Sequence, residues 1–219
     1  ITRETVRRAR QGYFANISYI DDKVGDLLET LRTTRMLDNT IVLFTSDHGD
    51  MLGERGLWFK MSFFEGSARV PLMVAGPGVT PRLVNEPVST LDINPTLADL
   101  AGIDIGEILP WTDGESLVPL MQGGKRTTPV LMEYTAEGSQ APLVCIREGD
   151  WKFSHCELDP PMLFNLKDDP QELTNLAADP ANAETFKASA SRYLADLDAL
   201  GREVRAAVAQ IPESRRKVI

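Results

Sequence analysis

Near its start the chain carries apolar residues at helical spacing. No proline occurs between positions 5 and 32. The large apolar side chains of this stretch follow one another at helical intervals: Tyr13, Ile17, Ile20, Val24, Leu27, Leu28 and Leu31. Because a helix repeats about every 3.6 residues, this spacing lines one helical face. We expect one long helix from about Thr5 to Arg32, leading into a strand at Ile41.

Two short apolar runs then predict strands. Residues 41–44 combine β-branched, aliphatic and aromatic side chains, so we expect a buried parallel strand there. Residues 71–75 predict another strand of the sheet, because Gly-Pro-Gly at 76–78 ends the run.

A helix is expected after these strands, from Thr90 to about Ala101. Gly102 stops this helix, since glycine readily takes the left-handed conformation that follows a helix end. Asp92, in the first turn, is assigned to capping rather than to chemistry.

The pattern changes beyond the glycine pair at 123–124. Short runs rich in β-branched and aromatic residues predict antiparallel strands at 130–134, 143–147 and 151–155, the last two joined by a tight turn. Apolar residues between Phe186 and Leu200 predict a helix that covers one face of this sheet. His155 is expected to be an ordinary strand residue.

The elements together predict an α/β fold in two parts. Residues 1–124 would form an α/β part in which helices flank the sheet. Residues 125–219 would form a small α+β subdomain of antiparallel sheet and helix.

A carboxylate and an imidazole directly follow the first predicted strand. Asp47 and His48 fall at its carboxyl end, where ligands of open α/β sheets gather. Side by side they can share a divalent cation: oxygen ligands favour calcium or magnesium, and the imidazole widens the choice to manganese or zinc. Alternatively, Asp47 caps the following turn and His48 is a hydrogen-bonded loop residue. Lys60 follows within reach of the same loop, and its ammonium can hold a tetrahedral anion. Its presence favours the metal-site interpretation over the turn-capping one.

Three separated motifs resemble the sulfatases of the alkaline-phosphatase superfamily. They are a helix at 13–25, the segment 46–71 with its Ser-Asp-His-Gly start, and a C-terminal signature at 163–176. The resemblance implies that residues 1–124 form the C-terminal part of the sulfatase catalytic α/β domain, with an alkaline-phosphatase-like mixed sheet flanked by helices. Within the family, the choline-sulfatase-like subgroup is the most similar, on His48 and the segments 58–61 and 110–114.

The resemblance implies a sulfuric ester hydrolase that converts choline sulfate to choline and sulfate. Asp47 and His48 would be ligands of a divalent cation, usually Ca²⁺, with Mn²⁺ or Mg²⁺ as alternatives. Lys60 would act in catalysis and in substrate binding by contacting the sulfate oxygens.

Four further charged residues can be interpreted as functional or as structural. By the same resemblance, Glu137 is the candidate for facing the quaternary ammonium of choline, which a carboxylate and aromatic faces stabilise. Alternatively, Glu133 and Glu137 are solvated residues at a strand end. Glu65 and Arg69 are expected to organise the loop and the element that follows it.

The nucleophile of the family does not occur in this chain. Sulfatases use a formylglycine made from the first residue of a Cys/Ser-x-Pro-x-Arg motif, and neither Cys145 nor Cys156 begins one. We therefore interpret the chain as the C-terminal half of a sulfatase, inactive alone. Its partners would be the N-terminal half of the same enzyme and a small-molecule sulfate ester, and the complete enzyme would be a homo-oligomer.

Composition narrows the partners further. The formal net charge of -9 argues against binding to nucleic acid or to anionic membranes. No apolar run approaches the roughly 18 residues of a membrane span. Cys145 and Cys156 lie eleven positions apart, which matches no zinc or redox motif, so we expect free thiols and a cytoplasmic location.

Two other functions stay open beside the sulfatase interpretation. A phosphonate monoester or phosphodiester hydrolase of the same superfamily would share the Asp-His pair and differ in the leaving-group pocket. A non-catalytic, truncated assembly module is the third possibility.

Overall fold

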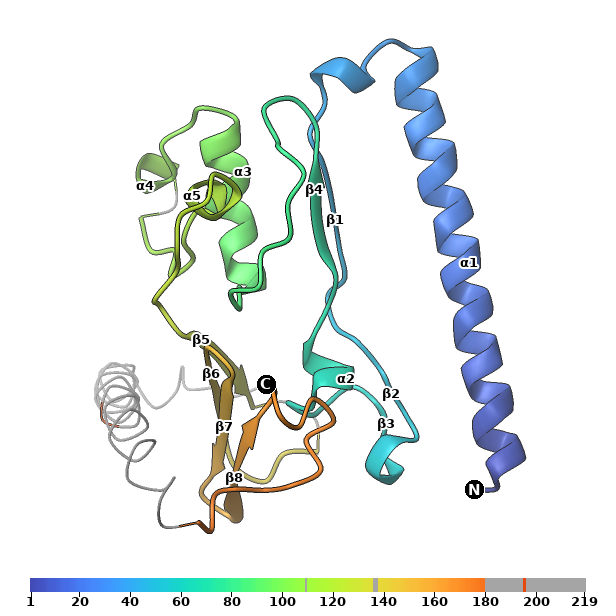
Figure 1. Ribbon diagram of the computed structural model, residues 1–219, viewed down its shortest axis with the longest axis vertical. Coiled ribbons are helices and arrows are strands. Elements are labelled where there is room, and N and C mark those ends of the chain that lie inside the picture. Colours follow the sequence, from blue (N-terminus) through green and yellow to red (C-terminus); the bar gives the residue numbers. More distant parts are fainter. Residues whose placement is uncertain (109, 136–137, 180–194, 196–219) are drawn as a thin grey trace, which may run out of the picture.

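The computed structural model describes residues 1–108, 110–135, 138–179 and 195 (Figure 1). Helix α1 (Arg3–Thr33) stands along one side of the molecule. It begins at Thr2, whose Oγ1 accepts a hydrogen bond of 3.2 Å from the amide of Thr5. The predicted helix is confirmed, but none of its residues is buried, and apolar side chains such as Phe14 and Leu27 are exposed.

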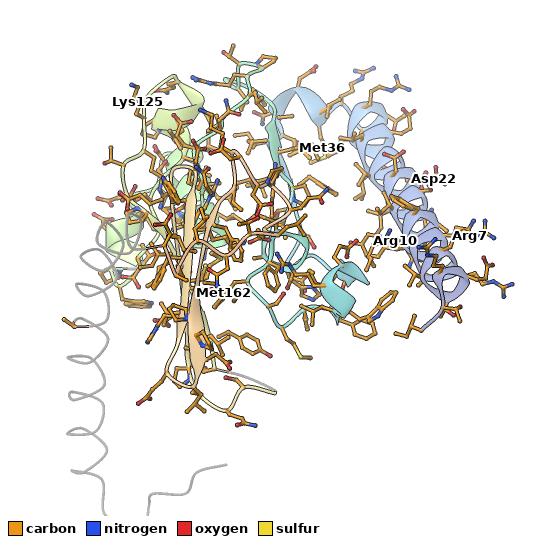
Figure 2. The ribbon with its side chains drawn as sticks, turned by 60° about the horizontal axis from the view of Figure 1, so that its bottom comes forward. Arg7, Arg10, Asp22, Met36, Lys125 and Met162 are labelled. Carbon is orange, nitrogen blue, oxygen red and sulfur yellow. The ribbon has the colours of Figure 1, made fainter. Side chains whose placement is uncertain are left out.

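Helix α1 is tied to the rest of the chain near its N-terminal end. Arg10 donates to the carbonyl of Leu52 at 3.0 Å and to Glu54 Oε1 at 2.7 Å. Figure 2 labels Arg10 on the side of α1 that faces the body of the molecule and Arg7 on the outer side. At the other end, the 3-10 turn η1 (Leu37–Asn39) leads into the first strand.

Strand β1 (Val42–Thr45) pairs with β4 (Leu72–Ala75), and the pairing is antiparallel. The prediction of a parallel strand is therefore wrong for the described residues, as is full burial, because β1 is only half-buried. An apolar run carries no information on strand direction. Direction is set by the connection, in which the chain doubles back before β4.

That connection contains the short elements of the candidate site. Strands β2 (Met51–Leu52) and β3 (Trp58–Phe59) pair antiparallel around the 3-10 turn η2 (Glu54–Gly56). The one-turn helix α2 (Glu65–Ala68) follows and leads into β4.

The predicted helix after β4 is confirmed as the turn η3 (Thr90–Asp92) and helix α3 (Ile93–Leu100). Asp92 caps it, as expected: its Oδ2 accepts from the amide of Ser89 at 2.7 Å, in a capping box. Gly102 takes a φ of +70° after the helix end. Two short helices, α4 (Ile105–Ile108) and α5 (Val118–Met121), complete this region.

The second part of the chain is a four-stranded antiparallel sheet in the order β5-β6-β7-β8. Strands β5 (Val130–Tyr134), β6 (Leu143–Glu148) and β7 (Trp151–Cys156) confirm the three predicted strands, with His155 in β7. Strand β8 (Asp159–Asn165) was not predicted from its apolar pattern, because it contains two prolines. Proline is tolerated there because β8 is an edge strand whose register shifts near Cys156.

The most deeply buried apolar residues lie mainly in this sheet and in the segment before it: Leu117, Leu120, Val130, Cys145, Ile146, Cys156, Leu163 and Phe164. Met51, in the candidate site region, is also buried. Both cysteines are free thiols, as expected. The helix predicted between Phe186 and Leu200 lies outside the described residues. No helix among the described residues is long and apolar enough to cross a bilayer.

Candidate functional site

The loop after β1 holds the carboxylate of Asp47 through only one of its oxygens. Oδ1 accepts hydrogen bonds from the amide of His48 at 3.0 Å and from Ser46 Oγ at 3.3 Å. Ser46 Oγ also lies 2.8 Å from the carbonyl of His48. The side chain of Asp47 is 85% exposed. The turn-capping interpretation therefore accounts for Oδ1 and leaves Oδ2 for another partner.

The imidazole of His48 is oriented by its neighbour. Nδ1 lies 2.8 Å from the carbonyl oxygen of Gly49. Because a carbonyl only accepts, Nδ1 carries the proton in this contact, and Nε2 of the neutral ring keeps its lone pair. Metal-binding histidines characteristically donate their other ring N–H to a carbonyl or carboxylate in this way.

The two donor atoms without a backbone partner, Oδ2 of Asp47 and Nε2 of His48, lie close together. Nε2 of His48 lies 3.5 Å from Oδ2 of Asp47. Two donors that share one cation at bond lengths of about 2.0–2.6 Å lie roughly 3–4 Å apart. The geometry therefore fits a pair of ligands to a single divalent cation.

Electrostatics favour the deprotonated form of Asp47, which is the form that a metal ligand needs. The hydrogen bond from the backbone amide of His48 is the main cause that lowers the pKa of the Asp47 carboxyl below its ordinary value. A ligating carboxyl must be deprotonated, so a lowered pKa favours binding. Among the described residues, no group of three or more His, Cys, Asp or Glu side chains could hold a metal, so Asp47 and His48 could supply at most two donors of a complete set.

Lys60 follows β3 in a strained turn. Its neighbours Phe59 and Met61 have φ values of +66° and +77°, which side-chain-bearing residues rarely adopt. Lys60 is exposed, and within the described part of the chain it makes no hydrogen bond or ion pair. Its ammonium can therefore meet an anion without first breaking another interaction. The structure records no contact that joins Lys60 to Asp47 or His48, so their shared site remains a prediction.

Glu137, the candidate for facing the quaternary ammonium of choline, lies outside the described residues. Glu133 is an exposed residue of β5, as the alternative interpretation expects.

Glu65 has a structural partner that the sequence did not reveal. Its Oε1 accepts a hydrogen bond of 2.8 Å from Nζ of Lys152, which also lies 2.8 Å from Glu172 Oε1. This agrees with the expectation that Glu65 organises the loop. Lys152 and Glu172 were not predicted as relevant to the site. Lys152 could have been noticed as a charged residue within a predicted strand, whereas nothing in the local pattern around Glu172 indicates its role.

Comparisons with known proteins place the chain in a family. Residues 2–103 match the family described as Sulfatase, and residues 53–198 match the family described as N-sulphoglucosamine sulphohydrolase, C-terminal. The chain belongs to the sulfatase family, within the alkaline-phosphatase superfamily.

Its relatives include bacterial and animal sulfatases. The chain is 68% identical to a choline-sulfatase of Rhizobium meliloti (strain 1021) over 82% of its own length and 35% of that protein. It is 39% identical to an arylsulfatase K of Gallus gallus over 80% of its length and 35% of that protein. The chain thus spans about a third of the length of these relatives.

The fold also matches a phosphonate monoester hydrolase of Agrobacterium radiobacter, with a TM-score of 0.75 and 31% sequence identity, over 89% of this chain and 42% of that one. The architecture of the described residues is therefore that of the sulfatase and phosphonate monoester hydrolase fold.

Proposed function

We propose that this chain supplies part of the active site of a choline-sulfatase-type sulfuric ester hydrolase, which converts choline sulfate to choline and sulfate. The observation that carries the proposal is the 68% identity to a choline-sulfatase over a stretch that includes most of this chain. Because the chain spans about a third of that protein, the activity belongs to an assembly in which these residues contribute only some of the groups.

Asp47 and His48 are proposed as two ligands of the divalent cation. Oδ2 and Nε2 are the donor atoms, since Oδ1 and Nδ1 are engaged by backbone or Ser46 partners. The hard carboxylate favours Ca²⁺, with Mn²⁺ or Mg²⁺ as alternatives. When bound, such a cation would polarise a sulfate oxygen and neutralise developing charge.

Lys60 is proposed to contact the sulfate oxygens. A fixed ammonium beside the sulfuryl group stabilises the charge that develops there in the transition state. Glu137 is proposed to face the quaternary ammonium of choline, where a carboxylate supplies the opposite charge. The complementary groups, namely the formylglycine nucleophile and further metal ligands, would belong to the part of the relatives that this chain does not span.

The remaining proposals concern organisation. Residues 1–124 are proposed as part of the catalytic domain and residues 125–219 as the C-terminal subdomain. A homo-oligomeric enzyme in the cytoplasm, joined to an N-terminal half, is the arrangement that we propose for the whole assembly.

A chimera tests this function. This chain would replace the matching third of the Rhizobium meliloti choline-sulfatase, and the purified chimera would be assayed for release of sulfate from choline sulfate. Hydrolysis at a rate comparable to the parent enzyme supports the proposal. A folded, metal-loaded chimera that leaves choline sulfate intact would contradict it.

The similarity to a phosphonate monoester hydrolase favours one alternative, a phosphonate monoester or phosphodiester hydrolase. The same chimera would be offered choline sulfate and a phenyl phosphonate monoester in parallel. A kcat/KM that is higher for the phosphonate would favour this alternative, since the two activities differ in the pocket that holds the leaving group.

A further inference from the structure

A buried cluster of charges joins three distant segments of the chain. Nζ of Lys152, in β7, lies 2.8 Å from Oε1 of both Glu65 and Glu172. The side chains of Lys152 and Glu172 are each 3% exposed, and that of Glu65 is 26% exposed. Glu65 begins α2, and Glu172 lies in the loop after β8. We call these three residues the lysine cluster.

Glu172 also caps helix α2. Its Oε2 accepts a hydrogen bond of 2.7 Å from the backbone amide of Glu65. The N-cap residue of α2 is Phe64, which provides no side-chain cap. The orphan amides at a helix start need an acceptor, and an anion is the favoured one. The C-terminal loop thus supplies the acceptor that the local sequence lacks.

The loop holds Glu172 in a demanding conformation. Its φ is +56°, in the left-handed region that a glutamate rarely adopts. Asp169 stabilises the same loop by accepting backbone hydrogen bonds, and the amides of Leu173 and Thr174 lower its pKa. A strained residue persists only where its surroundings fix it, so the position of Glu172 is closely determined.

Helix α2 in turn contacts the loop that follows β1, which carries Asp47, His48 and Gly49, through its backbone. The amide of Gly49 donates a hydrogen bond of 2.8 Å to the carbonyl of Ser67, in α2. A Cβ atom at Gly49 would collide with the carbonyl oxygen of Gly66, so the two backbones are in direct contact. Gly49 is also the residue whose carbonyl orients the ring of His48.

These contacts form a continuous path. The lysine cluster fixes the start of α2, Ser67 of α2 holds the amide of Gly49, and the carbonyl of Gly49 holds Nδ1 of His48. We propose that Lys152 and Glu172 are positioning residues for the candidate metal site: they set the direction of His48 Nε2 through α2 and Gly49. This inference rests on the proposed function, because it assigns the C-terminal sheet a part in building that site.

The energetics favour a positioning role over a purely stabilising one. A buried ion cluster contributes little net stability compared with a well-packed apolar alternative, because desolvation offsets the attraction between its charges. Removing one partner leaves the other charges uncompensated and forces the local structure to move. The geometry of α2 should therefore respond to the lysine cluster more strongly than the rest of the fold does.

Amide hydrogen exchange and ¹⁵N NMR of the 219-residue chain test the proposal. Lys152→Met and Glu172→Gln each remove one charge of the cluster, and Glu172→Gln keeps the volume and an acceptor oxygen. Lys152→Arg retains the charge and serves as the conservative variant. Lys23→Met breaks the exposed Lys23–Asp26 pair on α1 and serves as the matched control.

In both charge-removing variants the Gly49 amide should exchange at least about fivefold faster, as expected when roughly one hydrogen bond's worth of protection is lost. The ring ¹⁵N shifts of His48 should move toward a mixture of tautomers. Lys152→Arg should leave both readouts closer to those of the unaltered chain, and amides of α1, which carries none of the three cluster residues, should change little.

Unchanged Gly49 exchange and unchanged His48 ring shifts in folded Glu172→Gln would overturn the proposal. So would an equal acceleration across the whole chain, which would indicate a general loss of stability. These readouts involve neither metal nor substrate. A chimera that fails to hydrolyse choline sulfate would therefore reject the proposed function without deciding whether Lys152 and Glu172 position His48.

Discussion

The carbonyl oxygen of Gly49 lies 2.8 Å from Nδ1 of His48, and this contact decides which nitrogen of the ring is available to a ligand. With the proton on Nδ1, Nε2 keeps its lone pair and faces Oδ2 of Asp47 at 3.5 Å. A ring lone pair and a carboxylate oxygen that face each other repel one another unless a cation or a proton lies between them. The contact therefore fits the divalent cation that we propose for this site.

The first prediction concerns metal binding. Asp47→Asn and His48→Ala should each weaken Mn²⁺ binding by the choline-sulfatase chimera at least about tenfold, because each removes a proposed ligand. Titration followed by the EPR signal of free Mn²⁺ measures this. Asp38→Asn, at an exposed position before β1, is the control and should leave affinity unchanged. Equal affinities for all three variants would remove Asp47 and His48 from the metal site.

The second prediction concerns the contact between two backbones. Gly49→Ala should lower both the metal affinity and the temperature of thermal unfolding, because the added Cβ collides with the carbonyl of Gly66. Gly12→Ala is the matched control, since a Cβ there meets no atom within 4 Å. Thermal unfolding and Mn²⁺ titration of both variants would be compared. If Gly12→Ala lowered the metal affinity and the unfolding temperature by the same amounts, the collision would not be the cause.

The third prediction concerns the pair between Asp92 and Arg126. Arg126 Nη1 lies 2.5 Å from Asp92 Oδ2, and their side chains are 7% and 0% exposed. Arg126→Met leaves the Asp92 carboxylate without its cation, so the free energy of unfolding should fall by about 3–5 kcal/mol. Urea denaturation measures the change. Lys23→Met breaks an exposed pair and should cost no more than about 1 kcal/mol. Equal costs for the two variants would contradict the account.

The fourth prediction concerns alkaline pH. Burial is the main cause that raises the pKa of the Cys145 thiol from 9.0 to about 12. Because the folded chain holds this proton more tightly than the unfolded chain, its contribution to stability is complete below about pH 9 and is lost as pH rises toward 12. Cys145→Ala should therefore flatten the decline of stability over this range. An unaltered slope in urea denaturation would show that Cys145 does not cause it.

The same burial predicts low reactivity. Only the thiolate attacks alkylating reagents, so Cys145 of the folded chain should react with iodoacetamide at pH 8 far more slowly than in urea. Mass spectrometry of the labelled peptide measures the two rates. Similar rates in the two conditions would mean that Cys145 is accessible in the folded protein.

Local patterns predicted much of the fold. The apolar spacing before Thr33 predicted α1, and two short runs rich in β-branched and aromatic residues, joined by a tight turn, predicted β6 and β7. Asp92 was identified as a cap from its place in the first turn, which is a local property. Each of these features depends on residues that are close together in the sequence.

Features that depend on distant residues were not predictable in this way. The direction of β1 depends on how the chain returns to β4, and β8 contains prolines that only an edge position makes acceptable. The pairing of Lys152 with Glu65 joins positions that are 87 residues apart. The sequence could thus indicate Asp47, His48 and Lys60 as candidates, whereas the groups that orient Asp47 and His48 required the structure.

The most direct test of the account is the turnover of choline sulfate by the chimera with Lys60→Ala. The account predicts a kcat about 10²–10³ lower than that of the unaltered chimera, because one charge-stabilising contact is lost in the transition state. Lys23→Ala, on the exposed surface of α1, should leave kcat unchanged. An unchanged kcat in Lys60→Ala would contradict the placement of Lys60 at the sulfate and with it the proposed site.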